Sequence, residues 1–326
     1  MDRTSHVRIG TRASALARTQ TEWVAAQIRA WGFSVVTELV TTRGDVVVDV
    51  PIAGIAGGDG VFVRELERAL LDGRIDAAVH SFKDLPTAET PGLSLACVPC
   101  RASPFDAFLG RSAPTLEELP AGAVVGTSSI RRVMQIRLLR PDLAVRSIRG
   151  NVDTRLGLLD KGQCDGLILA AAGLERLGLV DRITQILRPD GFWPAVAQGA
   201  LVVQIRQDDA RMRSVVAPLD DPETHAAVRA ERACLAALAG GCLAPIAAWA
   251  RSEGGVLGLG ACVFEARGES VERIDSHGVS ADAGEKPEDL GGRVAGELLR
   301  RGAAGMIARA RLAGGATAGM GVHGRD

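Results

Sequence analysis

Short apolar runs alternate with amphipathic segments along most of the chain, a pattern typical of an α/β fold. Apolar runs at residues 7–10, 35–40 and 77–80 predict three buried strands. Helical spacing of apolar residues predicts one helix after the first strand and another over residues 62–71. In the first of these helices the spacing is kept by Leu16, Trp23, Ile28 and Trp31. The first hundred residues are therefore predicted to form one α/β unit.

The same alternation returns between about Asp106 and Trp193. Strands are predicted at residues 123–125, 143–148 and 166–171, and helical segments at 152–159 and 174–177. Residues 194–201 have the character of a return crossing between the two units. Two similar α/β halves with a cleft between them are expected.

The last third of the chain has a different pattern. An alanine-rich amphipathic helix is predicted over residues 223–238, alternating strands around 256–266, and a further helix over about 288–301. This predicts a smaller α+β domain. The tail from Ala313 is rich in glycine and alanine and is expected to be disordered.

Composition restricts the classes of partner. The chain has 326 residues, 47% of them hydrophobic and 24% charged, with a formal net charge of −1. That balance argues against nucleic acid or an anionic membrane as a partner. No apolar run approaches the roughly 18 residues of a membrane span, and residues 1–6 lack the apolar core of a signal peptide. A cytoplasmic protein is expected.

The six cysteines do not resemble a disulfide framework in a chain of this length. Cys97 and Cys100 have the spacing of a metal or redox pair, but no second pair or nearby histidine completes such a site. We favour two semi-buried thiols beside a domain crossover. Only three of the 38 cationic residues are lysines, so Lys83 inside a motif stands out.

Four arginines follow two equivalent strand-to-helix turns. Arg131 and Arg132 end the segment Gly-Thr-Ser-Ser-Ile-Arg-Arg, and Arg149 and Arg155 frame the segment Arg-Gly-Asn-Val-Asp-Thr-Arg. Parallel strands point both turns at one sheet edge, where helix N-termini and guanidinium groups bind carboxylate or phosphate. Any one of these arginines alone is more simply a solvated helix residue. For four at equivalent turns we favour an anion pocket.

Two further positions carry candidate chemistry. Lys83 and Asp84 follow the strand at residues 77–80, at the edge where open α/β sheets bind ligands. A carboxylate among arginines can stabilise a developing cation or pass a proton, although a surface ion pair is the simpler alternative. Cys242 follows two glycines in a constrained loop. Its thiol is either a covalent attachment point or a small buried apolar group.

Six segments in collinear order resemble the porphobilinogen deaminase family, also called hydroxymethylbilane synthases. The resemblance runs from residue 7 to about 310, and six motifs in order make it very specific. The matching segments are residues 10–17, 79–86, 126–132, 148–156 and 194–200, and Gly240-Gly241-Cys242 with Pro245-Ile246.

The resemblance implies a transferase of porphyrin and heme biosynthesis that condenses four porphobilinogen molecules into hydroxymethylbilane and releases ammonia at each step. It implies a dipyrromethane cofactor bound through a thioether to Cys242, and no metal. It also implies two periplasmic-binding-protein-like α/β domains with a hinge and a third α+β domain, in a monomer. The expected bounds are 1–100 with 196–218, 101–195, and 219–312 for the domain bearing the cysteine, with a disordered tail at 313–326.

Residue roles follow from the same resemblance. Asp84 matches the catalytic carboxylate that assists loss of the amino group. The cofactor's carboxylate arms match Ser81, Lys83, Thr127, Ser128, Ser129, Arg131, Arg132, Gly150 and Arg155. The substrate side matches Arg12, Ser14, Phe62, Arg149, Arg155, Arg176 and Gln198.

The chain departs from the family in its glycine-rich loop at residues 54–62. Asp59 stands where the family usually has lysine, which puts a direct substrate clamp by this loop in doubt, although Phe62 keeps a lid role open. Ala197 and Gln204 replace a common glycine and a common glutamate. Two alternatives remain: a non-catalytic two-domain protein that binds carboxylate or phosphate, and a paralogue of low activity.

Overall fold

The computed structural model describes residues 6–40, 63–239, 244–268 and 270–317. The described strands are β1 (His6–Thr11), β2 (Ser34–Leu39), β3 (Ala77–Ser81), β4 (Leu93–Cys97), β5 (Asp106–Gly110), β6 (Val124–Gly126), β7 (Ala144–Arg146), β8 (Gly166–Ala170), β9 (Gln185–Leu187), β10 (Leu201–Arg206), β11 (Ile246–Glu253), β12 (Val256–Arg267) and β13 (Ser270–Ser280). The described α-helices are α1 (Ala15–Ala30), α3 (Arg64–Leu71), α4 (Ile130–Leu139), α5 (Val152–Asp160), α6 (Ala171–Arg176), α7 (Ala210–Val216), α8 (Pro222–Ala237), α9 (Pro287–Arg300) and α10 (Ala303–Thr317), with short 3-10 turns η3 (Phe82–Asp84), η4 (Val180–Arg182) and η5 (Ala217–Leu219).

The first lobe is built on a five-stranded sheet of order β2-β1-β3-β10-β4. Strands β1, β2 and β3 are parallel, and β10 runs antiparallel between β3 and β4. Its core holds Val7 and Ile9 of β1 against Val24 and Ile28 of α1, all fully buried. Because β1 and β3 are parallel, Arg12 and the segment after Ser81 leave the sheet at the same edge.

The second lobe repeats this plan with the order β7-β6-β8-β5-β9. Strands β6, β7 and β8 are parallel, and β5 is the antiparallel insertion. The chain enters this lobe between β4 and β5 and returns between β9 and β10, as expected for a return crossing at residues 194–201. Because β6 and β7 are parallel, the loops that follow them leave the sheet at the same edge.

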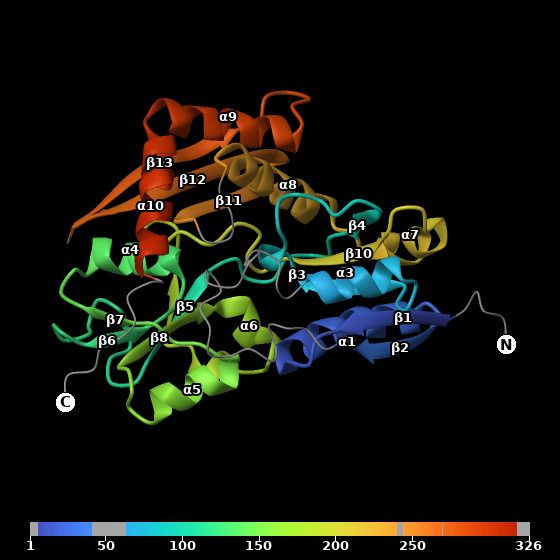
Figure 1. Ribbon diagram of the computed structural model, residues 1–326, viewed down its shortest axis with the longest axis horizontal. Coiled ribbons are helices and arrows are strands. Elements are labelled where there is room, and N and C mark those ends of the chain that lie inside the picture. Colours follow the sequence, from blue (N-terminus) through green and yellow to red (C-terminus); the bar gives the residue numbers. More distant parts are fainter. Residues whose placement is uncertain (1–5, 41–62, 240–243, 269, 318–326) are drawn as a thin grey trace.

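The third lobe is an antiparallel sheet of order β11-β12-β13, with α8 and α9 packed on it. In Figure 1 it lies above the other two, with the second lobe at the left and the first at the right. The expected fold class, two α/β units and a smaller α+β unit, is confirmed.

Most predicted elements lie within a few residues of their observed bounds, but two expectations need correction. Helix α1 forms as predicted, yet Trp23 and Trp31 are 46% and 41% exposed, and its inward face is made of smaller residues such as Val24 and Ala25. The tail expected to be disordered from Ala313 is helical through Thr317 in α10.

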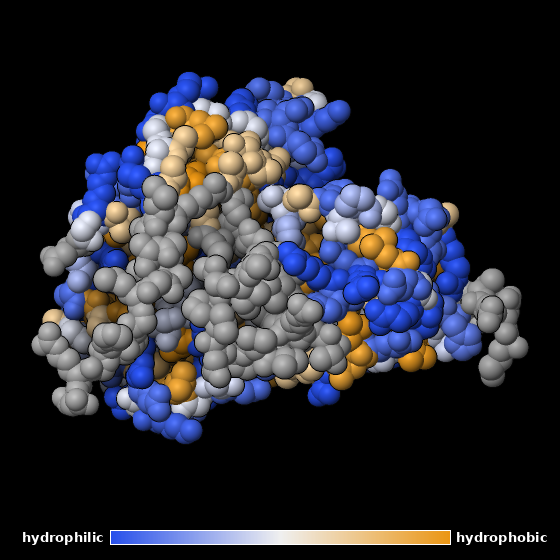
Figure 2. Space-filling view, viewed as in Figure 1, coloured by the Kyte–Doolittle hydropathy of each residue, from blue (hydrophilic) through white to orange (hydrophobic). Residues whose placement is uncertain are grey.

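The surface in the view of Figure 2 is mostly hydrophilic over the first lobe, with small hydrophobic patches. None of the helices in the described part of the chain is long and apolar enough to cross a membrane. Cys97 is buried, which raises the pKa of its thiol to about 12, whereas Cys100 is exposed. The two cysteines therefore differ in environment, and among the described residues there is no group of ligands suited to a metal ion.

Candidate active site where the two lobes meet

The turn after β3 separates the side chains of Lys83 and Asp84. Phe82 is buried at the start of the 3-10 turn, and its backbone N–H donates to the carbonyl of Ala200 at 3.0 Å. Lys83 is half-buried and Asp84 is exposed. Because one 3-10 turn advances by only three residues, the buried Phe82 fixes where its two neighbours point. Asp84 thus presents a carboxylate at the carboxyl end of a buried strand.

Lys83 is connected to Asp106 of the second lobe through the side-chain amide of Gln198. Its Nζ donates to Oε1 of Gln198 at 3.2 Å, and Nε2 of Gln198 donates to Oδ1 of Asp106 at 3.0 Å. Burial lowers the pKa of Lys83 to about 8, and the positive charges of Arg132 and Arg131 act in the same direction. The negative charges of Asp84 and Asp106 oppose that shift. Lys83 is therefore cationic at neutral pH and loses its proton slightly above it.

Asp106, at the start of β5, is a site residue that the sequence analysis missed. It is fully buried and accepts hydrogen bonds from Arg131 Nη1 at 2.7 Å and from Arg132 Nε and Nη2 at 3.0 and 2.7 Å. Burial alone raises the pKa of this carboxyl, but the two guanidinium groups outweigh burial and hold the pKa well below its usual range. Two adjacent arginines at a helix start were a sign that such a counter-charge exists.

Arg131 and Arg132 consequently lie beneath the site as buried cations that Asp106 holds in place. Both are almost completely buried, at 4% and 6% exposure. Arg131 also donates to the carbonyl of Trp193, and Arg132 Nη1 donates to the carbonyl of Ile168 at 2.7 Å. The structure thus gives these two arginines a fixed orientation that the sequence did not predict.

Arg155 lies where the charges of both lobes meet. Its Nε donates to the carbonyl of Gly150 at 2.9 Å, and burial lowers its pKa to about 10. Repulsion from Arg132 and Arg149 contributes to this lowering in the same direction as burial, and Asp84 of the first lobe opposes it. Positive charges are therefore crowded here, and an anion bound among them would relieve the repulsion.

The hydroxyl residues before α4 hold the loop rather than the helix end. The buried Thr127 accepts a hydrogen bond at Oγ1 from the backbone N–H of Ser129 at 3.3 Å. The Ser128 hydroxyl contacts the Ser147 hydroxyl at 3.0 Å and donates to the carbonyl of Ile148. Ser129 occupies the N-cap position, but its side chain does not cap the helix. The hydroxyl groups of this segment therefore bind within the loop and leave the start of α4 without a side-chain cap from Ser129.

The residues expected on the substrate side surround the same edge. Ser14 caps α1 by accepting from the N–H of Ala17 at 3.3 Å, and Arg176 Nη2 donates to the carbonyl of Gly199 at 2.7 Å. Burial lowers the pKa of His80 to about 4, the hydrogen bond to Gln204 opposes that shift, and the charge of Arg12 adds a smaller lowering, which places Arg12 near this histidine.

Three expected site residues remain. The Ser81 hydroxyl accepts a hydrogen bond from Nε2 of Gln20 at 3.0 Å. Phe62 and Cys242 lie outside the described residues, as does Asp59. In the described part of the site, Lys83 of the first lobe and Arg155 of the second are close enough for the charge of the exposed Asp84 to act on both.

The sequence analysis also missed two residues of α8 that contact this region from the third lobe. Glu231 is fully buried and accepts hydrogen bonds from Arg101 Nη1 and from the N–H of Ala197, both at 2.6 Å. Arg232 donates to the carbonyls of Leu85 and Pro86. The sequence alone does not show these roles, because the partners of Glu231 and Arg232 are far apart in the chain.

The fold and the site define a three-lobed α/β protein in which cationic side chains of two lobes lie near one exposed carboxylate. The family model described as porphobilinogen deaminase, dipyromethane cofactor binding domain, matches residues 7–214, and that of the porphobilinogen deaminase C-terminal domain matches residues 225–300. The chain belongs to the porphobilinogen deaminase family.

Curated relatives agree with this assignment. A porphobilinogen deaminase of Roseiflexus castenholzii is 47% identical over 302 residues, which cover 92% of this chain and 98% of the relative. One of Acidothermus cellulolyticus is 48% identical over 303 residues, with 92% and 90% covered. Among solved structures, the methionine-binding protein MetQ has a TM-score of 0.44 and 13% identity over 68% of this chain and 93% of that one. A structural similarity this weak carries no argument.

Proposed function

We propose that the residues where the two lobes meet catalyse the reaction of the family, in which four porphobilinogen molecules are joined into hydroxymethylbilane and ammonia leaves at each step. The observation that carries this proposal is the meeting of Asp84 from the first lobe with the crowded arginines of the second: the charges of Asp84, Arg132 and Arg149 all act on the buried Arg155. Each pyrrole unit bears two carboxylates, so a growing chain needs several fixed cations.

The described residues fit the family's dipyrromethane cofactor. Its acetate and propionate arms match the cationic groups of Lys83, Arg131, Arg132 and Arg155, whose mutual repulsion favours bound anions. When bound through Cys242, the dipyrromethane supplies the pyrrole carbon to which the first substrate molecule is joined. The family model that matches residues 7–214 is described as the dipyromethane cofactor binding domain.

Asp84 is proposed to act on the incoming substrate. As the bond between the aminomethyl carbon and the protonated amino nitrogen breaks, the nitrogen leaves with the electron pair as ammonia, and the positive charge spreads onto the substrate pyrrole. An exposed carboxylate at the strand end stabilises that charge and accepts a hydrogen bond from the pyrrole N–H. A carbon–carbon bond then forms, and the proton released from the attacking ring carbon is passed on through the carboxylate or solvent.

The remaining assignments extend this scheme. We propose that Arg12, Ser14, Arg149 and Arg176 hold the carboxylates of the incoming ring, with Arg155 shared between ring and cofactor. Ser81, Thr127, Ser128, Ser129 and Gly150 are proposed on the cofactor side, and Phe62 and Gln198 on the substrate side. These assignments are supported by the position of the described residues among them, which lie at the same edge of the first and second sheets.

The mass of the intact protein tests the proposal. Freshly purified wild-type chain should exceed its sequence mass by two linked pyrroles, and Cys242→Ala should remove the excess. Cys100→Ala, which changes an exposed thiol, is the control and should keep it. An unmodified wild-type mass, with no product from porphobilinogen, would support the non-catalytic alternative.

A second variant separates cofactor binding from chemistry. Asp84→Asn should keep the added mass and lower kcat by at least about 100-fold, because a carboxylate facing a developing cation is lost. Glu89→Gln, which removes another exposed carboxylate nearby, should keep kcat. Near-normal turnover in Asp84→Asn would place the catalytic carboxylate elsewhere.

We also propose the three domains expected from the sequence, with the third extended to Thr317 by α10, together with a monomeric state and a cytoplasmic location. The three sheets support the division into domains, since β10 completes the first sheet after the chain has passed through the second. Light scattering on the cofactor-loaded protein tests the monomer, for which a mass near 34.0 kDa is expected.

A further inference from the structure

Helix α8 of the third lobe presents two adjacent residues of opposite charge to the site. Glu231 accepts hydrogen bonds from Ala197 N–H and from Arg101, whose Nε also donates to the carbonyl of Gln198 at 2.8 Å. Arg232 points to the other side, toward the turn that carries Asp84. One turn of helix thus contacts both segments that deliver site residues from the first lobe.

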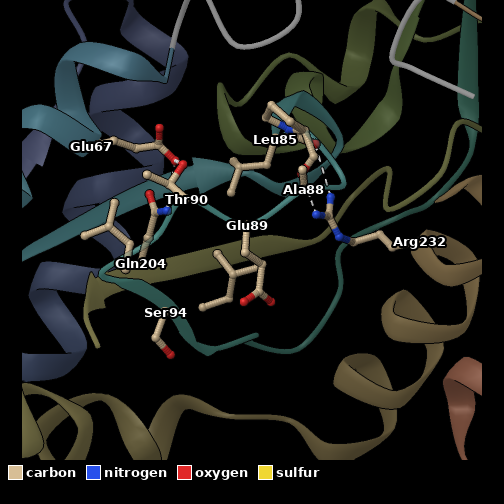
Figure 3. Close-up of a pocket in the computed structure, with 11 residues that line it drawn as sticks. Glu67, Leu85, Ala88, Glu89, Thr90, Ser94, Gln204 and Arg232 are labelled. Carbon is tan, nitrogen blue, oxygen red and sulfur yellow. Dashed lines mark hydrogen bonds between the residues drawn. The ribbon is translucent and has the colours of Figure 1, made fainter. Parts of the chain in front are cut away.

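Arg232 holds this turn from both ends. Its Nη1 and Nη2 donate to the carbonyls of Leu85 and Pro86 at 3.1 and 2.6 Å, the dashed lines of Figure 3. Its guanidinium group lies 4.5 Å from the centre of the Phe82 ring. Asp84 lies between Phe82 and Leu85 in the chain, so the Arg232 side chain contacts residues both before and after Asp84.

We propose that Arg232 is a positioning residue for Asp84, an inference that rests on the proposed function. The turn's own hydrogen bond, from Leu85 N–H to the carbonyl of Phe82, is 3.2 Å long, and a single 3-10 turn has little intrinsic stability. A planar guanidinium group supplies two directed donors and a flat face at once, which an ammonium group does not.

The space behind the turn supports this role. The cavity there, lined by Leu85, Pro86, Gln204 and Arg232 among others, has a volume of about 10 Å³, room for about one water molecule (Figure 3). Arg232 is one of the side chains that line this space, so its removal would open more room into which the turn can move. A shift of about 1 Å in a catalytic group is enough to cost roughly 100-fold in rate.

The two charged residues of α8 together help to fix the positions of Lys83 and Asp84. Glu231 holds the segment of Gln198, whose side chain accepts from Lys83, while Arg232 holds the turn of Asp84. In the chain, α8 also precedes Cys242. The third lobe is thereby a part of the catalytic geometry as well as the carrier of the cofactor cysteine.

The test measures kcat, KM, cofactor mass and melting temperature for Arg232→Ala and Arg232→Lys. We expect kcat to fall about 10- to 100-fold in Arg232→Ala and less in Arg232→Lys, with KM changed less than threefold, because Arg149 and Arg155 are untouched. The added cofactor mass should remain in both. Arg229→Ala is the matched control: it lies on the same helix in an exposed pair with Glu288 at 2.5 Å, and its kcat should equal that of the wild type.

A second variant guards against a simple folding defect. Phe82→Leu removes the aromatic face but leaves both carbonyl contacts, so kcat should fall by a smaller factor than in Arg232→Ala. Unchanged kcat in Arg232→Ala would overturn the positioning role. A fall in kcat that is accompanied by an equally large rise in KM and by loss of the added cofactor mass would also overturn it. A wild-type protein without added mass or turnover would instead overturn the proposed function.

Discussion

Asp106 illustrates how a single buried residue organises the site. Three side chains from two segments donate to its carboxylate: Arg131 and Arg132 of α4, and Gln198. A buried ion pair recovers its desolvation cost only when geometry is good and hydrogen bonds are complete, and loss of one partner leaves a charge uncompensated. The carboxylate therefore matters more for the arrangement of two arginines than for overall charge.

Replacement of this carboxylate should be costly. Asp106→Asn is expected to lower the free energy of unfolding by about 3–5 kcal/mol, because the buried Arg131 and Arg132 lose their counter-charge. Urea denaturation measures this value. Asp160→Asn, in an exposed pair with Arg182 in the same lobe, should cost no more than about 1 kcal/mol. Equal effects in the two variants would contradict the role of Asp106.

The lowered pKa of Lys83 predicts a pH dependence of substrate binding. KM for porphobilinogen should rise as pH passes about 8, because the ammonium group proposed to hold the cofactor's carboxylate arms loses its proton and fixes the pyrrole that receives the substrate less firmly. Lys83→Arg should remove that rise, since a guanidinium group stays charged, whereas the exposed Lys161→Arg should retain it. A rise of the same size in Lys83→Arg would assign it to another group.

The same group affects stability with a defined sign. Its folded pKa of about 8 lies below the ordinary value of 10.5, so the unfolded chain binds more protons between these pH values. The contribution of Lys83 to stability therefore increases as pH rises from about 8 to 10.5.

Among the elements, the glycine at the start of α5 decides how Arg155 is held. Gly150 has φ +98, a conformation that side chains rarely adopt, and a Cβ there would lie 2.9 Å from Thr154. Its carbonyl accepts the hydrogen bond from Arg155. The turn and the orientation of the arginine thus depend on one residue without a side chain.

Gly150→Ala should lower the free energy of unfolding by about 1–3 kcal/mol, because a strained backbone and a contact with Thr154 are added. It should also raise KM, because Arg155 loses its fixed acceptor. Gly157→Ala is the control within α5: a Cβ there has no neighbour within 4 Å, and alanine favours a helix interior by about 0.5–1 kcal/mol. If both changes stabilise the protein, the strain at Gly150 is not relevant.

Helices and strands themselves were largely predictable. Periodicity located α1, α5, α8 and α9 because spacing of apolar residues is a local property. It did not predict which aromatic residues face inward: the tryptophans of α1 are partly exposed, and smaller residues pack against the sheet. The size of the space beneath a helix is set by residues distant in the chain, so spacing alone does not determine which residue fills it.

Across the whole molecule, Glu231 ties the third lobe to the other two. Its four hydrogen bonds come from Arg101, Ala197 and Ala250, which belong to the crossings between lobes and to β11. It is fully buried, so the connection is shielded from solvent. The position of the third lobe relative to the site therefore depends on this carboxylate.

Glu231→Gln should lower the free energy of unfolding by about 3–5 kcal/mol, because Arg101 loses its charged partner in a buried setting. Weaker coupling should also broaden the thermal transition or split it in two, which calorimetry detects. Glu288→Gln, which affects only an exposed pair of α8 with α9, should leave a single sharp transition. A single sharp transition in Glu231→Gln would limit this residue to local stability.

The sequence by itself determined the alternation of strands and helices, the motifs of the family and the candidate residues Asp84, Lys83 and Cys242. These follow from local spacing and from short segments that are complete within the chain. Only the tertiary structure decided which charges meet: Asp106 binds arginines 25 and 26 positions away, and Glu231 binds Arg101 across 130 positions. Partner choice among buried charges depends on how the lobes pack, because each ion is stable only where its counter-charge and hydrogen bonds are assembled.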